Sequence, residues 1–433
     1  MRLPRAPAID AWVVDSTVKG YPGDAPPMPL GEIRARGWNV LRDGLPLPVA
    51  VLKASSLQHN RAWMRRYLES AGAVLCPHGK TTMSPQLFAA QLEDGAFGIT
   101  CASIAQLQVY RRHGIRRVLM ANQLVSERAL AFAMGELARD AEFELYLLVD
   151  SVAGVERLAA AARAASLPSA VRVLLEVGAD GARTGVRTMA EFEVLLGAVE
   201  AAGARLRVHG VECYEGVVEP AGTTREAAIE ALFGFQLAAS ARARRSHSAA
   251  TPWLLSAGGS AYFDVAARRL RAGIGGDDGL LVLRSGCYLS HDHGAYQHAQ
   301  RSREGRDPAL AAFGEGLRPA FEVWTHVQSR PEPTRAHLTA GKRDVPSDLD
   351  LPKPIAWFRP TMHGAPQPLR DGHCIVKLND QHAHLAVPAD SPLAVGDLVA
   401  LGISHPCTAF DRWQLLYVVV DDYAVVDAIR TFF

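Results

Sequence analysis

Residues 171–213 read VRVLLEVGADGARTGVRTMAEFEVLLGAVEAAGARLRVHGVEC. Two apolar runs, Val171–Val177 and Val208–Cys213, have the composition of buried β-strands, and Met189–Ala202 between them has the apolar spacing of an amphipathic helix. A strand, a helix and a second strand in this order predict a parallel pair of strands, because the helix returns the chain to the level at which the first strand began.

The same rhythm repeats about eight times over roughly 220 residues. The expected strands are Ala73–Cys76, Gly98–Cys101, Val118–Ala121, Glu144–Val149, Val171–Val177, Val208–Cys213, Trp253–Ser256 and Leu280–Arg284. Eight such units predict a (β/α)8 TIM-like barrel within an α/β fold. A doubly wound sheet is the alternative, but that fold carries an early glycine-rich phosphate turn, and no GxGxxG follows the first strands here.

The barrel accounts for part of the chain only. We predict an N-terminal extension over 1–46, a strand over 47–54 that joins the β domain, the barrel over 55–300, a linker or surface insertion over 301–317, and a C-terminal antiparallel β domain over 318–433. Short apolar runs separated by turn residues indicate the last domain. These runs are Ala320–Val327, Cys374–Leu378, His384–Val387, Leu398–Leu401 and Gln414–Val420.

Composition excludes several classes of protein. The 433 residues are 48% hydrophobic and 21% charged, which excludes a disordered chain, and the net charge of +1 argues against nucleic acid as a partner. No apolar run reaches the ~20 residues of a membrane span, and the N-terminus lacks the apolar region of a signal peptide. We therefore expect a cytoplasmic protein without a membrane partner. The six cysteines form no CxxC pair, which predicts reduced thiols.

Lysine is rare in this chain, and one lysine stands where a barrel places catalytic groups. Lys80 follows the first expected strand in Pro77-His78-Gly79-Lys80-Thr81-Thr82, and lysine otherwise occurs only at 19, 53, 342, 353 and 377. Catalytic groups of barrels lie just beyond the carboxyl ends of the strands. Lys80 is thus a candidate imine-forming nucleophile, with an ordinary surface lysine as the alternative.

Later strand ends supply further candidates. Arg183 follows the fifth strand in a glycine-rich loop, and Tyr214 follows the sixth, where an aromatic ring either lies against a flat ligand or closes the barrel. Gly258-Gly259-Ser260 follows the seventh strand and Arg284-Ser285-Gly286-Cys287-Tyr288 follows the eighth. Barrel enzymes often bind phosphate in these last two loops, where bare glycine amides favour anions.

Ser404-His405-Pro406-Cys407 in the β domain is a candidate metal site. An imidazole and a thiolate two residues apart, on one side of an extended segment, suit zinc and leave coordination positions open. The alternative is a buried cysteine beside a hydrogen-bonded histidine. Other histidines that are candidates for further ligands are His291, His293, His298, His373, His382 and His384.

Together these motifs resemble the fold-type III enzymes that use pyridoxal phosphate, in particular the D-serine dehydratase and D-threonine aldolase family with its amino acid deaminase subgroup. The resemblance runs from about Leu47 to Phe433. It is carried by Pro77–Thr81, Gln91–Gln106, Gly181–Val186, Gly210–Gly216, Gly258–Ser260, Arg284–Tyr288, Ala340–Asp344 and His405–Cys407. The chain departs from the family at Lys80-Thr81-Thr82, where Lys-Thr-His is frequent.

The resemblance implies roles for these residues. Lys80 would be the catalytic residue that forms the imine with the cofactor. Arg183 and Tyr214 would lie near its ring. Its phosphate would be held by Gly259, Ser260, Gly286 and Cys287, largely through backbone amides. His405 and Cys407 would bind the metal, and because thiolate is a soft ligand we expect zinc rather than manganese or magnesium.

The resemblance also implies an activity. We expect a deaminase, or dehydratase, of 3-hydroxy D-amino acids that yields a 2-oxo acid and ammonia, and preference for the D enantiomer rests on the resemblance alone. The alternatives are a D-threonine aldolase-type lyase, an amino acid racemase and a non-catalytic pyridoxal-phosphate-binding protein of cofactor homeostasis. In the related fold a partner's β domain completes each site, so we expect a homodimer.

Overall fold

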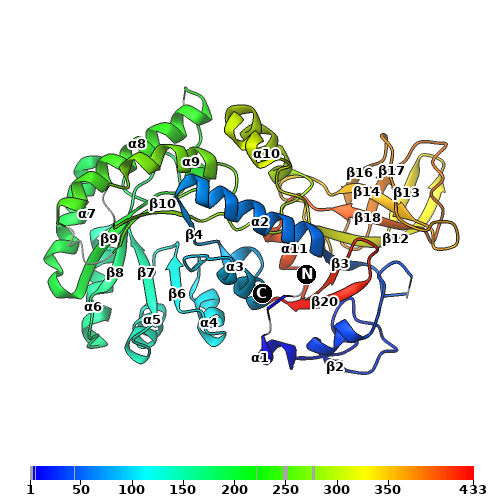
Figure 1. Ribbon diagram of the computed structural model, residues 1–433, viewed down its shortest axis with the longest axis horizontal. Coiled ribbons are helices and arrows are strands. Elements are labelled where there is room, and N and C mark those ends of the chain that lie inside the picture. Colours follow the sequence, from blue (N-terminus) through cyan, green and yellow to red (C-terminus); the bar gives the residue numbers. More distant parts are fainter. Residues whose placement is uncertain (1–2, 5, 43, 221, 247–251, 276–277) are drawn as a thin grey trace. The chain divides into compact units, whose positions relative to one another are not determined.

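The computed structural model describes residues 3–4, 6–42, 44–220, 222–246, 252–275 and 278–433. The chain forms two compact units, each built from segments that are discontinuous in sequence. The first, here called the α/β unit, comprises Arg65–Lys80 and Leu92–Gly286. The second, here called the β unit, comprises Met1–Met64, Thr81–Gln91 and Cys287–Phe433. Figure 1 labels the elements of both.

The α/β unit contains a curled, wholly parallel sheet of eight strands in the order β4-β11-β10-β9-β8-β7-β6-β5. The strands are β4 (Val74–Leu75), β5 (Ile99–Cys101), β6 (Arg117–Met120), β7 (Glu144–Val149), β8 (Val171–Glu176), β9 (Leu206–Glu212), β10 (Trp253–Ala257) and β11 (Gly279–Leu283). A parallel bridge between His78 and Thr100 links the β4 end of this order to the β5 end. Nearly every strand residue is buried, as expected for a parallel sheet covered by helices.

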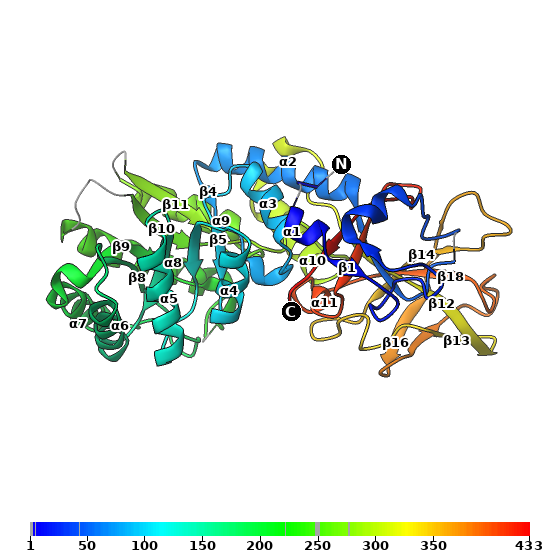
Figure 2. The ribbon, with the colours of Figure 1, turned by 90° about the horizontal axis from the view of Figure 1, so that it is seen from below.

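Helices connect successive strands and lie on the outer side of the sheet, as the two ribbon views show (Figures 1 and 2). They are α4 (Ile104–Arg112), α5 (Glu127–Arg139), α6 (Val152–Ala164), α7 (Met189–Ala201), α8 (Arg225–Ala243) and α9 (Phe263–Leu270). Most begin at a side-chain cap; Thr188, for example, forms a reciprocal capping box with Glu191 before α7. Two further helices, α2 (Ala54–Ala71) and α3 (Pro85–Glu93), contribute residues to both units.

The β unit is built on a mostly antiparallel sheet. Its strands are β3 (Val49–Lys53), β12 (Phe321–Glu332), β13 (Arg335–Leu338), β14 (Lys353–Phe358), β15 (Gln367–Pro368), β16 (Cys374–Leu378), β17 (Ala383–Ala386), β18 (Leu398–Gly402), β19 (Leu415–Val419) and β20 (Val425–Arg430). Strand β3 pairs antiparallel with β12 and parallel with β19, so the N-terminal part of the chain is an interior strand of this sheet. Helices α10 (Ala295–Arg306) and α11 (Cys407–Phe410) complete the unit, with the 3-10 helix η7 at Pro308–Phe313.

The first 46 residues pack against this sheet. They form α1 (Pro7–Asp10), β1 (Val13–Val14), β2 (Met28–Pro29) and the 3-10 helix η1 (Leu30–Ala35). Their apolar side chains, such as Ile9 and Ile33, join one buried cluster with Val51, Trp324 and Tyr417. The segment therefore supplies part of the hydrophobic core of the β unit.

The predicted fold class is confirmed: eight parallel strands alternate with helices, and a mostly antiparallel β domain follows. All eight strands predicted in the α/β unit are present, with ends that differ by one or two residues. Strands β13, β14 and β15 were not predicted, because short strands with exposed or polar residues give weak alternation. Strand β20 and helix α10 were not predicted either. Residues 301–317, expected to be a linker, include the end of α10 and η7.

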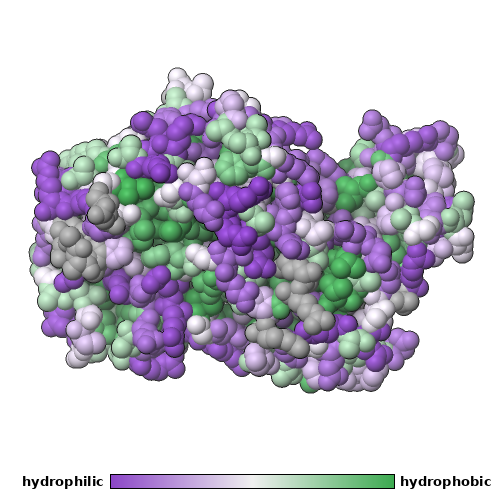
Figure 3. Space-filling model, viewed as in Figure 1, coloured by the Kyte–Doolittle hydropathy of each residue, from purple (hydrophilic) through white to green (hydrophobic). Residues whose placement is uncertain are grey.

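No helix among the described residues has both the length and the apolar character needed to cross a membrane. Figure 3 shows hydrophilic residues over most of the displayed face, with smaller hydrophobic patches between them.

One ion pair with a buried carboxylate ties the N-terminal segment to the rest of the β unit. Lys19 Nζ lies 2.7 Å from Asp344 Oδ1 and 3.6 Å from the centre of the Trp413 ring, and the Asp344 side chain is 2% exposed. We expect Lys19→Ala to lower the free energy of unfolding by about 2 kcal/mol, because it leaves Asp344 buried without its cation. Chemical denaturation measures the effect. Lys377→Ala on exposed β16 is the matched control, and equal stability of the two variants would contradict the prediction.

Candidate active site

The predicted site residues are distributed over both units. Lys80, Arg183, Tyr214, Gly259, Ser260 and Gly286 belong to the α/β unit, and Cys287, His405 and Cys407 belong to the β unit. The chain passes from the first unit to the second at Lys80–Thr81 and again at Gly286–Cys287. Both crossings thus fall inside motifs that the sequence singled out.

Cationic side chains converge at the carboxyl ends of the strands in the α/β unit. Burial lowers the pKa of His78 well below its usual value, and the charges of Lys80, Arg284 and Arg183 lower it further. The Nδ1 atom of His78 is buried without a hydrogen-bond partner. Lys80 is exposed in the 3-10 helix η2 (Gly79–Thr81), directly after the first strand. A neutral imidazole among three cations makes this end of the sheet suited to an anionic ligand.

Arg183 and Tyr214 lie together, although they follow different strands. The Arg183 guanidinium carbon is 5.2 Å from the centre of the Tyr214 ring, which is the geometry of a cation–π contact. The same ring lies close to the backbone of Gly259: a Cβ atom added there would be 2.9 Å from Tyr214 Cε2. The structure therefore brings three predicted residues of the α/β unit to one place.

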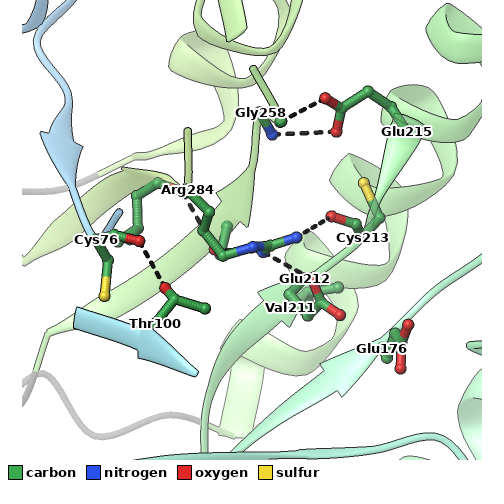
Figure 4. Close-up of polar contacts among 12 residues, drawn as sticks. Cys76, Thr100, Glu176, Val211, Glu212, Cys213, Glu215, Gly258 and Arg284 are labelled. Carbon is green, nitrogen blue, oxygen red and sulfur yellow. Dashed lines mark hydrogen bonds and ion pairs between the residues drawn. The ribbon is translucent and has the colours of Figure 1, made fainter. Parts of the chain in front are cut away.

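The glycine loop after β10 already binds an anionic group. The amides of Gly258 and Gly259 donate to the two carboxylate oxygens of Glu215, at 3.1 and 2.6 Å (Figure 4). Gly258 has φ +82°, and a side chain there would be 2.7 Å from Leu283, so the turn needs glycine. Burial raises the pKa of Glu215, against the effect of these amides. These two amides can bind an anion, and a phosphate group would bind them by displacing the Glu215 carboxylate.

Arg284 is the centre of a buried polar network beside this loop (Figure 4). Its guanidinium lies 2.7 Å from Glu212 Oε2, donates to Ser256 Oγ at 2.6 Å and donates to the Cys213 carbonyl at 2.8 Å. Both charged side chains are at most 3% exposed. Burial raises the pKa of Glu212 to about 8, and the charge of Arg284 acts in the opposite direction. Ser285 Oγ donates to the carbonyl of Gly258 at 3.0 Å, which joins the network to the glycine loop.

Sequence reasoning did not identify Glu212, Glu215 or Arg284 as functional side chains. All three occur in or next to predicted strand ends, where the residues predicted to be functional were the neighbouring Tyr214, Gly286 and Cys287. The available signal was an ionisable residue at or near the carboxyl end of a strand: Glu212 ends β9, Glu215 follows β9 by three residues and Arg284 directly follows β11. Such a residue is buried by its position and needs a partner.

The β unit contains a cluster of two thiols and a hydroxyl. Cys287 Sγ and Cys407 Sγ are 3.5 Å apart, and Thr81 Oγ1 lies 3.3 Å from Cys407 Sγ and 3.9 Å from Cys287 Sγ. Cys287 is buried and Cys407 is half-buried. Hydrogen bonding from Cys287, from His405 and from Thr81 lowers the pKa of Cys407 well below its usual value, against the effect of burial. Cys407 is accordingly the more acidic thiol of the pair.

His405 is held by a carboxylate that the sequence did not reveal. His405 Nδ1 lies 2.5 Å from Asp348 Oδ2, and Thr408 Oγ1 donates to the other oxygen of Asp348 at 2.7 Å. Burial lowers the pKa of His405, but the thiolate of Cys407 and the carboxylate of Asp348 together raise it to about 9. A carboxylate on one imidazole nitrogen is the usual support of a metal-binding histidine, because it orients the ring and leaves the other nitrogen free to bind.

The segment around His405 differs from the extended conformation expected from the sequence. Pro406 has φ −58° and ψ −39°, and Cys407 begins the short helix α11. The two side chains still interact through a hydrogen bond. Among the described residues, no group of three or more His, Cys, Asp or Glu side chains is arranged to hold a metal ion. The donor set of His405 and Cys407, with Asp348 behind it, fits a metal bound through two protein ligands.

Family models match both parts of the chain. Residues 52–275 match the alanine racemase N-terminal domain, and residues 320–419 match a putative serine dehydratase domain. The chain belongs to the alanine racemase N-terminal domain family. The pairing of these two domains is that of the fold-type III pyridoxal-phosphate enzymes, so the resemblance drawn from the sequence is confirmed.

Relatives of known activity are a dehydratase and an aldolase. D-threo-3-hydroxyaspartate dehydratase from Delftia sp. (strain HT23) is 31% identical over 253 residues, which cover 57% of this chain and 62% of that enzyme. D-threonine aldolase from Arthrobacter sp. is 27% identical over 382 residues, which cover 86% of this chain and 89% of the aldolase. The family to which the chain belongs thus includes pyridoxal-phosphate-dependent lyases.

Solved structures agree on the fold. D-threonine aldolase from Filomicrobium marinum matches with a TM-score of 0.71 at 23% identity, over 89% of this chain and 95% of that one. A cysteine-to-alanine variant of D-threo-3-hydroxyaspartate dehydratase in the metal-free form matches with a TM-score of 0.66, at 22% identity over 90% of this chain and 98% of that one.

The Arg284–Glu212 pair generates a prediction about stability. Arg284→Met should lower the free energy of unfolding by about 3 kcal/mol, because Glu212 is left buried without its cation. Arg116→Met is the control, since Arg116 pairs with Glu142 at 2.6 Å on the surface and its loss should cost about 0–1 kcal/mol. The double variant Arg284→Met/Glu212→Gln should recover part of the loss. Denaturant unfolding of the three variants decides, and equal losses for Arg284→Met and Arg116→Met would contradict the prediction.

Proposed function

We propose that this protein is a pyridoxal-phosphate- and metal-dependent deaminase of 3-hydroxy D-amino acids, of the D-serine dehydratase type. The net reaction converts a 3-hydroxy amino acid to a 2-oxo acid and ammonia, because the water lost from Cβ is regained when the resulting enamine is hydrolysed. The observation that carries the proposal is the pair of His405 and Cys407, with the His405 imidazole held by Asp348. Hydroxide is a poor leaving group, and this donor set suits a metal that binds its oxygen.

The cofactor is proposed for the electropositive strand ends of the α/β unit. Lys80 would bind it covalently and, once released by the substrate amine, would accept the α-proton at Nζ. The amides of the loops after β10 and β11, at Gly259, Ser260, Gly286 and Cys287, would hold its phosphate, and Arg183 and Tyr214 would position its ring. When bound, pyridoxal phosphate supplies an electron sink for the charge that develops at Cα.

Zinc is the proposed metal. A thiolate is a soft ligand that selects zinc over manganese and magnesium, which prefer oxygen ligands. Asp348 would raise the basicity of His405 and keep its free nitrogen directed at the ion. A bound ion supplies Lewis acidity at the β-hydroxyl oxygen of the substrate. The metal-free form in which a D-threo-3-hydroxyaspartate dehydratase variant was solved supports a metal in that structural neighbour.

A retro-aldol lyase is the second candidate, favoured by the two D-threonine aldolases among the relatives and neighbours. Such an enzyme removes the proton of the β-hydroxyl and breaks the Cα–Cβ bond, so its products are glycine and an aldehyde. The two activities therefore differ in products while sharing substrates.

Product analysis tests the proposal. Purified enzyme reconstituted with pyridoxal phosphate is offered D-serine, D-threonine and D-threo-3-hydroxyaspartate, each with and without EDTA. We expect 2-oxo acid and ammonia in equal amounts, abolished by EDTA and restored by zinc. Glycine with aldehyde would establish the aldolase instead, and racemised substrate or no turnover would overturn both candidates.

Substitutions at the proposed metal site should change metal binding without changing cofactor binding. We expect Cys407→Ala to lose bound zinc and to lower turnover on the order of a hundredfold, with unchanged pyridoxal phosphate content. Asp348→Asn should lower zinc affinity by about 10–100-fold, since it orients a ligand without binding the ion. Metal analysis and chelator competition measure both effects. Cys374→Ala, at an exposed cysteine of β16, is the control, and full zinc content in Cys407→Ala would refute the assignment.

Lys80 should be required for covalent attachment of the cofactor. Lys80→Ala is expected to lose the visible absorption of lysine-bound cofactor and all turnover, because no other group can take its place as nucleophile and base. Borohydride reduction followed by peptide mapping identifies the attachment site in the unaltered enzyme. Lys377→Ala serves as the control, and cofactor fixed to a different lysine would rule the assignment out.

The protein is also proposed to act as a homodimer, in which the β domain of one copy completes the site of the other. Light scattering at assay concentration should give twice the chain mass of 46.7 kDa. A fully active monomer would be incompatible with this arrangement.

A further inference from the structure

Cys287 and Cys407 are brought together from distant parts of the chain. Cys287 begins the segment that follows β11, and Cys407 begins α11, 120 positions later. Their sulfur atoms are 3.5 Å apart, and the hydroxyl of Thr81 contacts both. All six cysteines lie within the described residues and none is in a disulfide.

We propose that Cys287 and Cys407 form a reversible oxidation site, at which a peroxide converts the two thiols into a disulfide. A disulfide bond is ~2.05 Å long, so the two sulfurs need to approach by about 1.5 Å. A change of that size lies within the reach of side-chain rotation. The bond itself is inferred from the position of the two sulfurs, whereas its effect on activity rests on the proposed function.

Two steps balance the reaction. In the first, Cys407 Sγ attacks hydrogen peroxide: an S–O bond forms, the O–O bond breaks, one water leaves, and Cys407 carries a sulfenic acid. In the second, Cys287 Sγ attacks Cys407 Sγ: the S–S bond forms, the S–O bond breaks and a second water leaves. The two thiols lose two electrons and two protons together, and the peroxide is reduced to two molecules of water.

The difference in exposure indicates which of the two cysteines reacts first with the peroxide. Cys407 is half-buried, so a small oxidant reaches it, while Cys287 is 3% exposed and stands directly behind it. A reachable thiol with a second thiol in contact is the arrangement of redox-sensing cysteines, because the second thiol forms the disulfide before further oxidation occurs. Cys374 is more exposed but sits alone on β16, so it has no resolving partner among the described contacts.

The disulfide would affect both the proposed metal binding and the proposed binding of the cofactor phosphate. A disulfide removes the Cys407 sulfur as a metal ligand, and it also ties α11 to the residue whose backbone amide is proposed to hold the cofactor phosphate. A single bond would therefore switch off metal binding and constrain the phosphate loop until a thiol reductant restores it.

Mass spectrometry of the full-length protein tests the proposal. Zinc-stripped protein treated with a small excess of hydrogen peroxide should lose the mass of two hydrogens and two free thiols, and digestion should yield one peptide pair joined through Cys287 and Cys407. Dithiothreitol should reverse both changes. Stable addition of oxygen to Cys407 without the linked peptide, or a disulfide between other cysteines, would overturn the proposal.

Matched variants sharpen the test. Cys374→Ser should still form the linked peptide, whereas Cys287→Ser should instead accumulate oxygen on Cys407. Circular dichroism checks that each variant is folded, and the peptide map of the unaltered protein stands without them. Zinc-loaded protein provides a separate arm: if zinc slows disulfide formation, Cys407 is a metal ligand as proposed. Equal rates with and without zinc would count against the metal assignment and leave the oxidation site supported.

Discussion

A single guanidinium, that of Arg284, holds the candidate cofactor end of the α/β unit in place. It binds Glu212 at the end of β9, Ser256 in β10 and the carbonyl of Cys213, while itself following β11. Three neighbouring strands are thereby fixed at the level where their loops begin. Those loops carry Tyr214 with Glu215, the glycine pair, and the Gly286–Cys287 junction. The positions of Tyr214, of the glycine pair and of the Gly286–Cys287 junction therefore depend on this one buried cation.

The sequence was sufficient for the regular part of the fold, because apolar strands buried on both faces alternate with capped helices and leave a strong periodic signal. The sequence also predicts that Lys80, the glycine loop after β10 and the loop after β11 lie at one end of the sheet. In this architecture the site lies at the carboxyl ends of the parallel strands, and each of these segments directly follows a strand. The short strands β13 and β15 could not be predicted, because their residues are partly exposed and their pairing depends on distant segments. The same holds for the core role of residues 1–46.

The side chains that contact the predicted residues could not be predicted from the sequence, for a different reason. Asp348 reaches His405 across 57 positions, and Cys287 reaches Cys407 across 120, and no local pattern encodes contacts of that separation. Glu215 directly follows Tyr214, and nothing in the sequence distinguishes it from an ordinary acidic residue of a loop. The structure thus adds the supporting carboxylates and the second thiol, which decide the protonation states of the residues that the sequence had identified.

The discontinuous β unit has a consequence for how this protein is made. Strand β3 is synthesised early, yet its partners β12 and β19 lie more than 260 positions further along the chain. On the ribosome, the α/β unit is complete in sequence at Gly286, before either partner strand exists. The first 64 residues, with their apolar side chains, must wait through that interval without their sheet. Domains generally fold in order of synthesis, so this chain exposes an unpaired, aggregation-prone strand that only the arrival of its C-terminus can cover.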